Sequence, residues 1–440
     1  MPPWHDGSHM IGADTSLTDE ERAYLADCIE TLETEVFVDG LGRAHFDELD
    51  DNEESEADWR EYVARMGEQG FNGVAVPAEH GGGGKGVVET VLTEQAIGYC
   101  GAIVHACQTS LTQHIGRTLY DHGNDHLHEA YLEPMLAGDL VVSQAYTEPG
   151  SGTDLANLET TAEKAGDEWV INGEKRFIDF AAYGDFYFVP VRTSGADGDR
   201  EGVSLFVVDA DNAGIDLLED QSDWHGFRGT GAAWMRFENV HVPEANLVGE
   251  EGAAWPYITA ELNLEHLTVA RYCLGASQRS LEVAANYTAE REVNGQPVSR
   301  LQAVNHEVAD MATRLDAAYL LNTRAARVLD EEGLSSGRME SAMAKWYGND
   351  LAHEIADTCM QVVGGIATTD KYPLERVQRD VRVGRYLGGA SEVMKSIVQH
   401  DAYGELADDS FEGEYVGNEL EGVPWLGEQR PAPAADADDD

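Results

Sequence analysis

The 440-residue sequence predicts an α+β protein of several domains, in which a β-rich domain lies between two helical ones. Apolar residues recur three and four positions apart at 16–142 and again at 252–402, as they do in amphipathic helices. Between these regions, at 143–251, short β-rich runs are separated by Gly, Asp and Asn, as in strands joined by turns. A chain of this length is long enough for two or three domains with a sizeable core.

The first helical domain, 16–142, follows a short segment, 1–15, that we expect to be a loose extension. The stretch LTDEERAYLADCIETLE opens with a Thr and an acidic first turn, which is typical of a helix start. The run DELDDNEESEAD at 47–58 is so highly charged that we expect a solvated linker there. The stretch at 87–116 is mostly apolar and predicts a long, buried pair of helices.

The middle domain, 143–251, contains candidate strands in the runs EWVINGEKRFID, DFYFVPVRT, GVSLFVVDA and AAWMRFENVHVP. Within the first run, Asn172-Gly173 is a common pair in two-residue turns and predicts a hairpin.

The second helical domain, 252–402, begins with a long helix whose face is marked by residues at alternating spacings of three and four. They are Trp255, Ile258, Leu262, Glu265, Val269, Tyr272 and Ala276. Glu265 interrupts this otherwise apolar face, and a carboxylate there is costly unless it is paired or has a function. The segment 403–440 ends in PAPAADADDD and predicts an acidic, disordered tail.

The charge balance narrows the possible partners and the environment. The chain has 82 Asp and Glu against 29 Lys and Arg, a formal net charge of −53. Such a surface repels nucleic acid and anionic membranes, so we expect neither as a partner. An acidic, solvated surface suits high salt, where screening removes the self-repulsion, and we expect a halophilic source.

The cysteines and the hydropathy pattern predict a reduced, cytoplasmic protein. The five cysteines show no CxxC pair and no metal-ligand spacing, so we expect buried thiols and no metal site. No apolar run approaches 18 residues, and we expect no membrane span.

Five segments carry a resemblance to a known family. The loop AYTEPGSGTD at 145–154 presents backbone and hydroxyl groups that could bind a polar ring system, although alone it is equally an ordinary turn. The other segments are INGEKRFID, WHGFRGTGAAWMRFENVHVPEANLVG, EREVNGQPVSRLQAVNHEVADMATRL and QVVGGIATTDKYPLERVQRDVRVGRYLGGASEVMK. Together they resemble the acyl-CoA dehydrogenase family, in unbroken order over roughly 16–402.

The resemblance implies a fold and an activity. The fold would be an N-terminal helical domain, a middle β-barrel and a C-terminal four-helix bundle, in a homotetramer or dimer that shares FAD sites between subunits. The activity would be desaturation of an acyl-CoA to trans-2-enoyl-CoA, with electrons passed to an electron-transfer flavoprotein. A flavin oxidase or monooxygenase on the same fold, or a non-catalytic binding protein, remain alternatives, because fold alone does not settle a reaction.

The resemblance also implies cofactor and substrate contacts. At the flavin ring and phosphates it places Tyr146, Thr147, Thr153, Phe177 and Asp179. At the pyrophosphate and adenosine of a neighbouring subunit's FAD it places Arg291, Gln302, Gln361, Gly364, Gly365 and Glu392. At the substrate it places Thr153, His266, Gly388 and Gly389.

Asp179 is a departure from the family, which usually has Thr, Ser or Gly near flavin N5. An ionised Asp would oppose electron transfer into the flavin, so it must be protonated, turned away or part of an altered chemistry.

The catalytic base is expected at an unusual position. Most family members carry the glutamate where this chain has Gly388, and glycine cannot act as a base. The isovaleryl-CoA and long-chain types carry it instead on an earlier helix, in a Leu-x-Leu-Glu-Arg motif. The matching stretch LNLEH at 262–266 makes Glu265 the predicted base. The structural alternatives are a buried ion pair to His266 or an Arg, or a helix kept half exposed beside Glu261. The backbone N–H of Gly388 would donate to the thioester oxygen.

Overall fold

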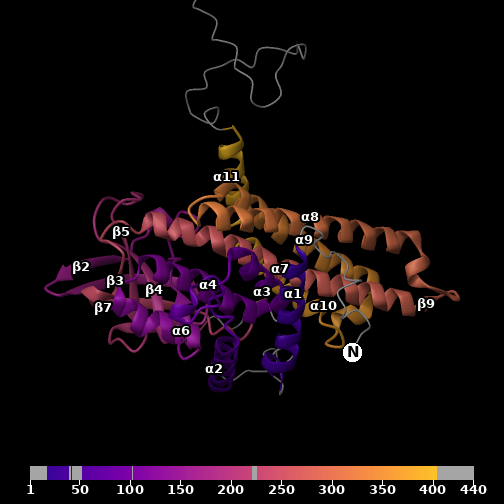
Figure 1. Ribbon diagram of the computed structural model, residues 1–440, viewed down its shortest axis with the longest axis horizontal. Coiled ribbons are helices and arrows are strands. Elements are labelled where there is room, and N and C mark those ends of the chain that lie inside the picture. The colour runs from indigo at the N-terminus through magenta and orange to yellow at the C-terminus, as the bar shows by residue number, and fades with distance from the viewer. Residues whose placement is uncertain (1–16, 39–40, 42–51, 102, 221–224, 404–440) are drawn as a thin grey trace, which may run out of the picture.

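Figure 1 shows the computed structural model, which describes residues 17–38, 41, 52–101, 103–220 and 225–403. The loose extension expected at 1–15, residues 47–51 of the predicted linker and the tail after Tyr403 lie outside the described residues.

The N-terminal domain is helical, as predicted. Its helices are α1 (Asp19–Thr31), α2 (Asn52–Glu68), α3 (Val87–Tyr99), α4 (Ile103–His122), α5 (Asp125–Leu127) and α6 (Glu133–Ala137). Helix α1 starts where the sequence indicated, because the hydroxyl of Thr18 accepts from the Glu21 amide while the Glu21 carboxylate accepts from the Thr18 amide. The predicted linker at 47–58 is wrong in its second half, since α2 already begins at Asn52.

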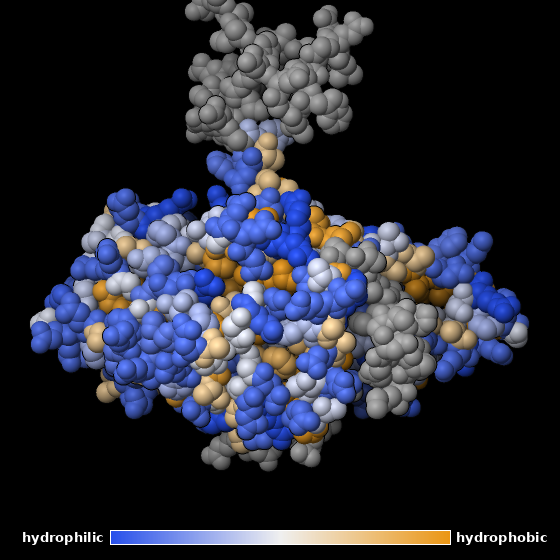
Figure 2. All heavy atoms as spheres, viewed as in Figure 1, coloured by the Kyte–Doolittle hydropathy of each residue, from blue (hydrophilic) through white to orange (hydrophobic). Residues whose placement is uncertain are grey.

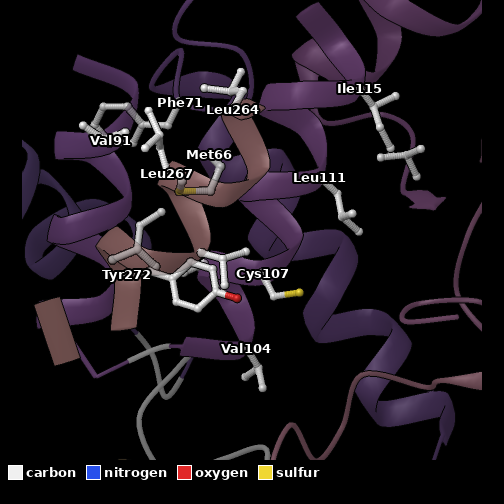
Figure 3. Close-up of a cluster of buried hydrophobic side chains, with 14 of the residues drawn as sticks. Met66, Phe71, Val91, Val104, Cys107, Leu111, Ile115, Leu264, Leu267 and Tyr272 are labelled. Atoms are coloured by element: carbon white, nitrogen blue, oxygen red, sulfur yellow. The ribbon is translucent and has the colours of Figure 1, made fainter. Parts of the chain in front are cut away.

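Helices α3 and α4 form the buried pair expected at 87–116, and both pack against the long helix α7 (Trp255–Glu290). Figure 3 shows part of the resulting core, where Cys107 and Leu111 of α4 belong to the same apolar cluster as Leu267 and Tyr272 of α7. This packing fixes the position of the middle of α7.

The middle domain is a twisted sheet of eight strands. They are β1 (Val142–Gln144), β2 (Thr161–Ala165), β3 (Glu168–Ile178), β4 (Phe186–Arg192), β5 (Val203–Asp209), β6 (Ile215–Asp220), β7 (Ala233–Pro243) and β8 (Leu247–Val248). Their order is β6-β7-β3-β2-β4-β5-β8, and β1 pairs in parallel with β4.

The predicted β-barrel is wrong. Strands β6 and β8 lie at opposite ends of the order, and no pairing joins them within the described residues. A barrel needs its two edge strands to pair, whereas β8 has only two residues and pairs with β5 alone. The hairpin turn expected at Asn172-Gly173 is also wrong, because β3 runs through it with a register shift. The turn lies instead between β2 and β3, where Gly166 has φ 72°.

The C-terminal domain is helical. It contains α7, α8 (Gln302–Glu332), α9 (Arg338–Val363), α10 (Leu374–Val381) and α11 (Ser391–Tyr403), with a small hairpin of β9 (Glu292–Val293) and β10 (Gln296–Pro297) between α7 and α8. On the predicted face of α7, Ile258, Glu265, Val269, Tyr272 and Ala276 are buried, but every residue from Asn263 to Gln278 is buried too, so the middle of the helix is enclosed on all sides. Helices α8, α10 and α11 each contact α9.

The surface matches the composition. Hydrophilic residues cover most of the face in Figure 2, and hydrophobic residues gather near its middle, below α11. No helix in the described part of the chain is long and apolar enough to cross a membrane. The five cysteines are all free and buried.

Candidate active site

Glu265 and Gly388 meet in space, although more than a hundred residues separate them in the sequence. Gly388 lies in the glycine loop, which we define as residues 384–390, between α10 and α11. Its φ is +61°, and a Cβ at this position would lie 2.7 Å from Oε1 of Glu265. The carboxylate of α7 therefore occupies the space into which a side chain at 388 would point. The two positions considered for the base are neighbours in one site.

Glu265 has the environment of a group with a raised pKa. Its side chain is buried, and its Oε2 has no hydrogen-bond partner among the described residues. Burial raises the pKa of Glu265, as does the nearby Glu261, whereas His114 and Lys345 oppose the rise. No Lys, Arg or His nitrogen lies within 4 Å of its carboxylate in the described part of the chain, so the ion pair considered as an alternative does not form there.

A second carboxylate lies one helical turn before Glu265. Glu261 is fully buried and accepts hydrogen bonds from Gln144 Nε2 at 2.6 Å and from the Tyr146 hydroxyl at 2.7 Å. Its Oε1 also lies 3.0 Å from His114 Nδ1. Gln144 is also among the groups that lower the pKa of Glu265, so one amide side chain influences both carboxyl groups. This network joins α4, β1 and α7, and it satisfies Glu261 without a lysine or arginine.

His266 faces the glycine loop. It is buried, and burial lowers its pKa to about 3, against which a hydrogen bond with the Gly388 backbone acts weakly. A Cβ on Gly389 would lie 3.6 Å from its Nε2. Glu265, His266, Gly388 and Gly389 are thus brought together, and His266 is a neutral side chain beside the carboxylate at ordinary pH.

A buried lysine holds the same loop. Lys345 of α9 has no exposed surface, and its Nζ donates to the Gly384 carbonyl at 2.6 Å and to the Gly389 carbonyl at 3.3 Å. Burial lowers the pKa of Lys345 to about 8, while Glu265 is among the groups that oppose this effect.

The loop at 145–154 is anchored by another buried pair. Glu148 accepts from Lys175 Nζ at 2.7 Å and from the amides of Glu159 and Thr160. The Thr147 carbonyl accepts from the Arg176 amide at 2.7 Å, so the loop is fixed against β3. These bonds leave Thr153 exposed at the loop tip. Tyr146, by contrast, is turned inward to Glu261.

Phe177, near the end of β3, and Asp179, directly after it, lie in opposite environments. Phe177 has φ 59° and is 51% exposed, and the Arg176 guanidinium stacks 4.7 Å from its ring. Asp179 is buried, and its Oδ1 has no partner in the described region. Burial raises the pKa of Asp179 to about 7, although a hydrogen bond with Thr230 opposes the rise. Near neutral pH a large fraction of Asp179 is therefore the uncharged acid.

The remaining predicted cofactor residues lie on the surface, and among them Glu392, two residues after the glycine loop, is near this site along the chain. All are exposed: Arg291, Gln302, Gln361, Gly364, Gly365 and Glu392. The hairpin β9–β10, next to Arg291, lies at the opposite end of the molecule from β3 in Figure 1. A Cβ on Gly364 or Gly365 would meet no atom within 4 Å.

Sequence reasoning missed Glu261, His114, Gln144 and Lys345. Lys345 left a signal, because the chain has only six lysines and this one stands in the apolar stretch AMAKWYG. A lysine retained inside a helix of a lysine-poor protein indicates a specific task. The sequence signal for Glu261 is weaker: it is the second acidic residue on an apolar helix face.

Comparison with known proteins identifies the family of the chain. Three domain models match it in order: acyl-CoA dehydrogenase, N-terminal domain at 18–139, middle domain at 143–240 and C-terminal domain at 252–402. An acyl-CoA dehydrogenase of Bacillus subtilis (strain 168) is 33% identical over 336 residues, covering 76% of this chain and 88% of the relative. The caffeyl-CoA reductase-Etf complex subunit CarC of Acetobacterium woodii is 31% identical, over 80% of this chain and 91% of that protein. Among solved structures, the glutaryl-coenzyme A dehydrogenase glutaryl-CoA complex has a TM-score of 0.79 at 27% identity, covering 88% of this chain and 96% of that one. The chain belongs to the acyl-CoA dehydrogenase family.

Proposed function

We propose that the chain is an FAD-dependent acyl-CoA dehydrogenase that converts an acyl-CoA into the trans-2-enoyl-CoA, with Glu265 as the catalytic base. The observation that carries this proposal is the contact between Glu265 and Gly388. A desolvated carboxylate stands at the place where most of the family positions its glutamate, and it stands there because the side chain at 388 is absent. Its raised pKa suits removal of a weakly acidic proton.

The residues at the end of β3 fit a flavin. A half-exposed Phe177 ring and the exposed tip of the 145–154 loop offer a stacking surface and polar groups. The buried Oδ1 of Asp179 has no hydrogen-bond partner among the described residues, as expected for a group that meets a ligand. Because the pKa of Asp179 is about 7, the protonated acid is available, and it carries no charge that would oppose electron transfer. When bound, FAD would supply the acceptor for the hydride from Cβ of the acyl group.

The chain's own residues would then act on the thioester. Glu265 would take the α-proton through Oε2, the oxygen that no described residue engages. The Gly388 N–H would donate to the thioester oxygen and stabilise the negative charge that develops on it. His266, kept neutral by burial, would close the site beside the base without adding a charge.

Six exposed residues of the C-terminal domain support a shared cofactor site. Arg291, Gln302, Gln361, Gly364, Gly365 and Glu392 are all exposed. Because exposed groups are open to a ligand or a second subunit, we propose that they bind the pyrophosphate and adenosine of a second subunit's FAD, in a homotetramer or dimer. We further propose a reduced, cytoplasmic, high-salt setting, which the buried free thiols and the net charge of −53 favour. An electron-transfer flavoprotein would accept the electrons.

The test is Glu265→Gln in molar salt. The variant should retain bound flavin and lose nearly all bleaching of the flavin by acyl-CoA under anaerobic conditions. A panel of short, long and branched acyl-CoAs identifies the substrate. If Glu265→Gln bleaches its flavin at a rate near that of the parent protein, Glu265 is not the base.

A flavin oxidase is the second candidate, because Asp179 replaces the small residue usual at the flavin edge. The rate at which air reoxidises the substrate-reduced flavin separates the two. Slow reoxidation supports the dehydrogenase, and fast reoxidation supports the oxidase.

A further inference from the structure

Lys345 is an unusual residue for the interior of a helical domain. Its side chain has no exposed surface, yet no carboxylate oxygen lies within 4 Å of its Nζ in the described part of the chain. Its hydrogen-bond partners are two carbonyl oxygens, of Gly384 and Gly389. Lysine is rarely buried without a direct ion pair, because moving an ammonium out of water is costly.

The carbonyl groups of Gly384 and Gly389 lie on either side of Gly388 in the glycine loop. By bonding both of them, one ammonium group ties the segment to α9 on each side of Gly388. Gly384 is itself tightly enclosed, since a Cβ there would lie 2.5 Å from Asn349 Nδ2. The φ of +61° at Gly388 and of +100° at Gly389 are backbone angles that glycine adopts readily and that residues with a Cβ disfavour.

Lys345 also lies in the electrostatic field of Glu265. The charged groups that act on Lys345 are Glu265 of α7 and Asp350 of its own helix, together with the Cys273 thiol. Those that act on Glu265 come from α4, α7 and α9: His114, Glu261 and Lys345. Asp179, after β3, is also influenced by Glu265. Lys345 is thus the buried lysine that faces both the carboxylate and the loop.

We propose that Lys345 is a positioning residue with two tasks: its hydrogen bonds hold the Gly388 segment against Glu265, and its positive charge favours the ionised form of Glu265. This inference rests on the proposed role of Glu265 and extends it. The buried cation would make the base available at a lower pH than burial alone would allow.

The experiment compares variants that separate the tether from the charge. Lys345→Met removes both, whereas Lys345→Gln keeps an N–H donor and removes only the charge. Asp350→Asn is the matched control on the same helix. Asp350 holds the other side of the loop through Arg385 at 2.7 Å and Ser391 at 2.9 Å, but it is not among the groups that act on Glu265.

The measurement is the pH dependence of kcat/KM between pH 5 and 8, whose acidic limb reports the pKa of the base in the free enzyme. Both Lys345 variants should move this limb to higher pH by about one unit, because an opposite charge nearby lowers a carboxyl pKa by about that much or more. Asp350→Asn should leave the limb in place. At a pH above the shifted limb, Lys345→Gln should be faster than Lys345→Met, because it can still donate to the loop.

The outcomes separate this inference from the proposed function. An unmoved limb in both Lys345 variants, with Glu265→Gln inactive, overturns the role of Lys345 and leaves Glu265 as the base. An active Glu265→Gln overturns both. If Lys345→Met does not fold, the acidic limb of kcat/KM is measured in Lys345→Gln alone. The infrared band of the protonated carboxyl, assigned by its loss in Glu265→Gln, then gives the same titration without turnover. A band that titrates as in the parent protein counts against the proposal.

Discussion

Replacing Gly388 with alanine tests the geometry on which the site depends. The new Cβ would lie 2.7 Å from Oε1 and 3.0 Å from Cδ of Glu265, whereas ordinary contact begins near 3.4 Å. The carboxyl group must therefore move by roughly 0.7 Å, the difference between 3.4 and 2.7 Å. Overpacking of this kind costs about 1–3 kcal/mol. A φ of +61° adds about 1–2 kcal/mol for a residue with a Cβ.

Only the first of these two costs depends on Glu265, which makes a double-mutant cycle informative. Gly388→Ala should lower the free energy of unfolding by about 2–5 kcal/mol in the parent chain and by about 1–2 kcal/mol in Glu265→Ala, where the colliding carboxyl is gone. Urea unfolding in molar salt measures all four proteins. Flavin bleaching in the single variant should slow by about 100-fold, because a base misplaced by an ångström loses that much. Equal costs in the two backgrounds would refute the contact between Gly388 and Glu265.

Three further predictions concern stability. Lys175→Met should destabilise the middle domain by about 3–5 kcal/mol, because it leaves the buried Glu148 without its cation; a loss below about 1 kcal/mol in urea unfolding would contradict this. His266 stays neutral in the folded state down to a pKa of about 3. The unfolded chain therefore takes up a proton first as pH falls below about 6.5, and stability is lost between that pH and 3. His266→Gln should reduce the decrease in the thermal unfolding midpoint between pH 7 and pH 4. An unchanged decrease would count against a neutral, buried His266. Raising KCl from 0.1 M to 2 M should raise the thermal midpoint, because the screening length shrinks from about 10 Å to below 3 Å around a chain of net charge −53; a midpoint independent of salt would oppose the halophilic proposal.

The helices were largely predictable because their signals are local. The spacing of apolar residues from Trp255 onward specifies the buried face of α7, and it also shows that Glu265 belongs to that face. The Thr18 cap and the following acidic turn fix the start of α1. In each case the residues that interact are within four positions of one another.

The failed expectations depend on interactions that local patterns do not contain. Whether a sheet closes into a barrel depends on the pairing of its edge strands, β6 and β8, which no single strand's pattern encodes. The acidic run at 47–58 was interpreted by its charge alone. Helix α2 nonetheless begins within it, because the next turns bury Trp59, Tyr62 and Met66, and acidic residues are favourable at a helix start.

The candidate active site was half predictable, because part of its signal is local and part depends on contacts between distant segments. Glu265 stood out on its own helix, and the absence of a side chain at 388 was visible in the sequence. Their proximity became visible only in three dimensions, as did the hydrogen bonds of Lys345, on α9, to the Gly384 and Gly389 carbonyls of the same loop.

The contact between Gly388 and Glu265 also explains why glycine, rather than any other residue, stands at 388. A glutamate at both positions would bring two carboxyl groups into one desolvated site. Because like charges at such a distance cannot both ionise, one would remain protonated and its pKa would rise sharply. Even an alanine at 388 would displace the carboxyl of Glu265. A base supplied by α7 therefore requires an empty position on the loop. The positive φ at 388 reinforces this requirement, because it disfavours every residue with a Cβ even before the carboxyl group is considered. The missing side chain at 388 and the glutamate at 265 are therefore two parts of one arrangement, in which the glycine leaves the space that the carboxyl group fills.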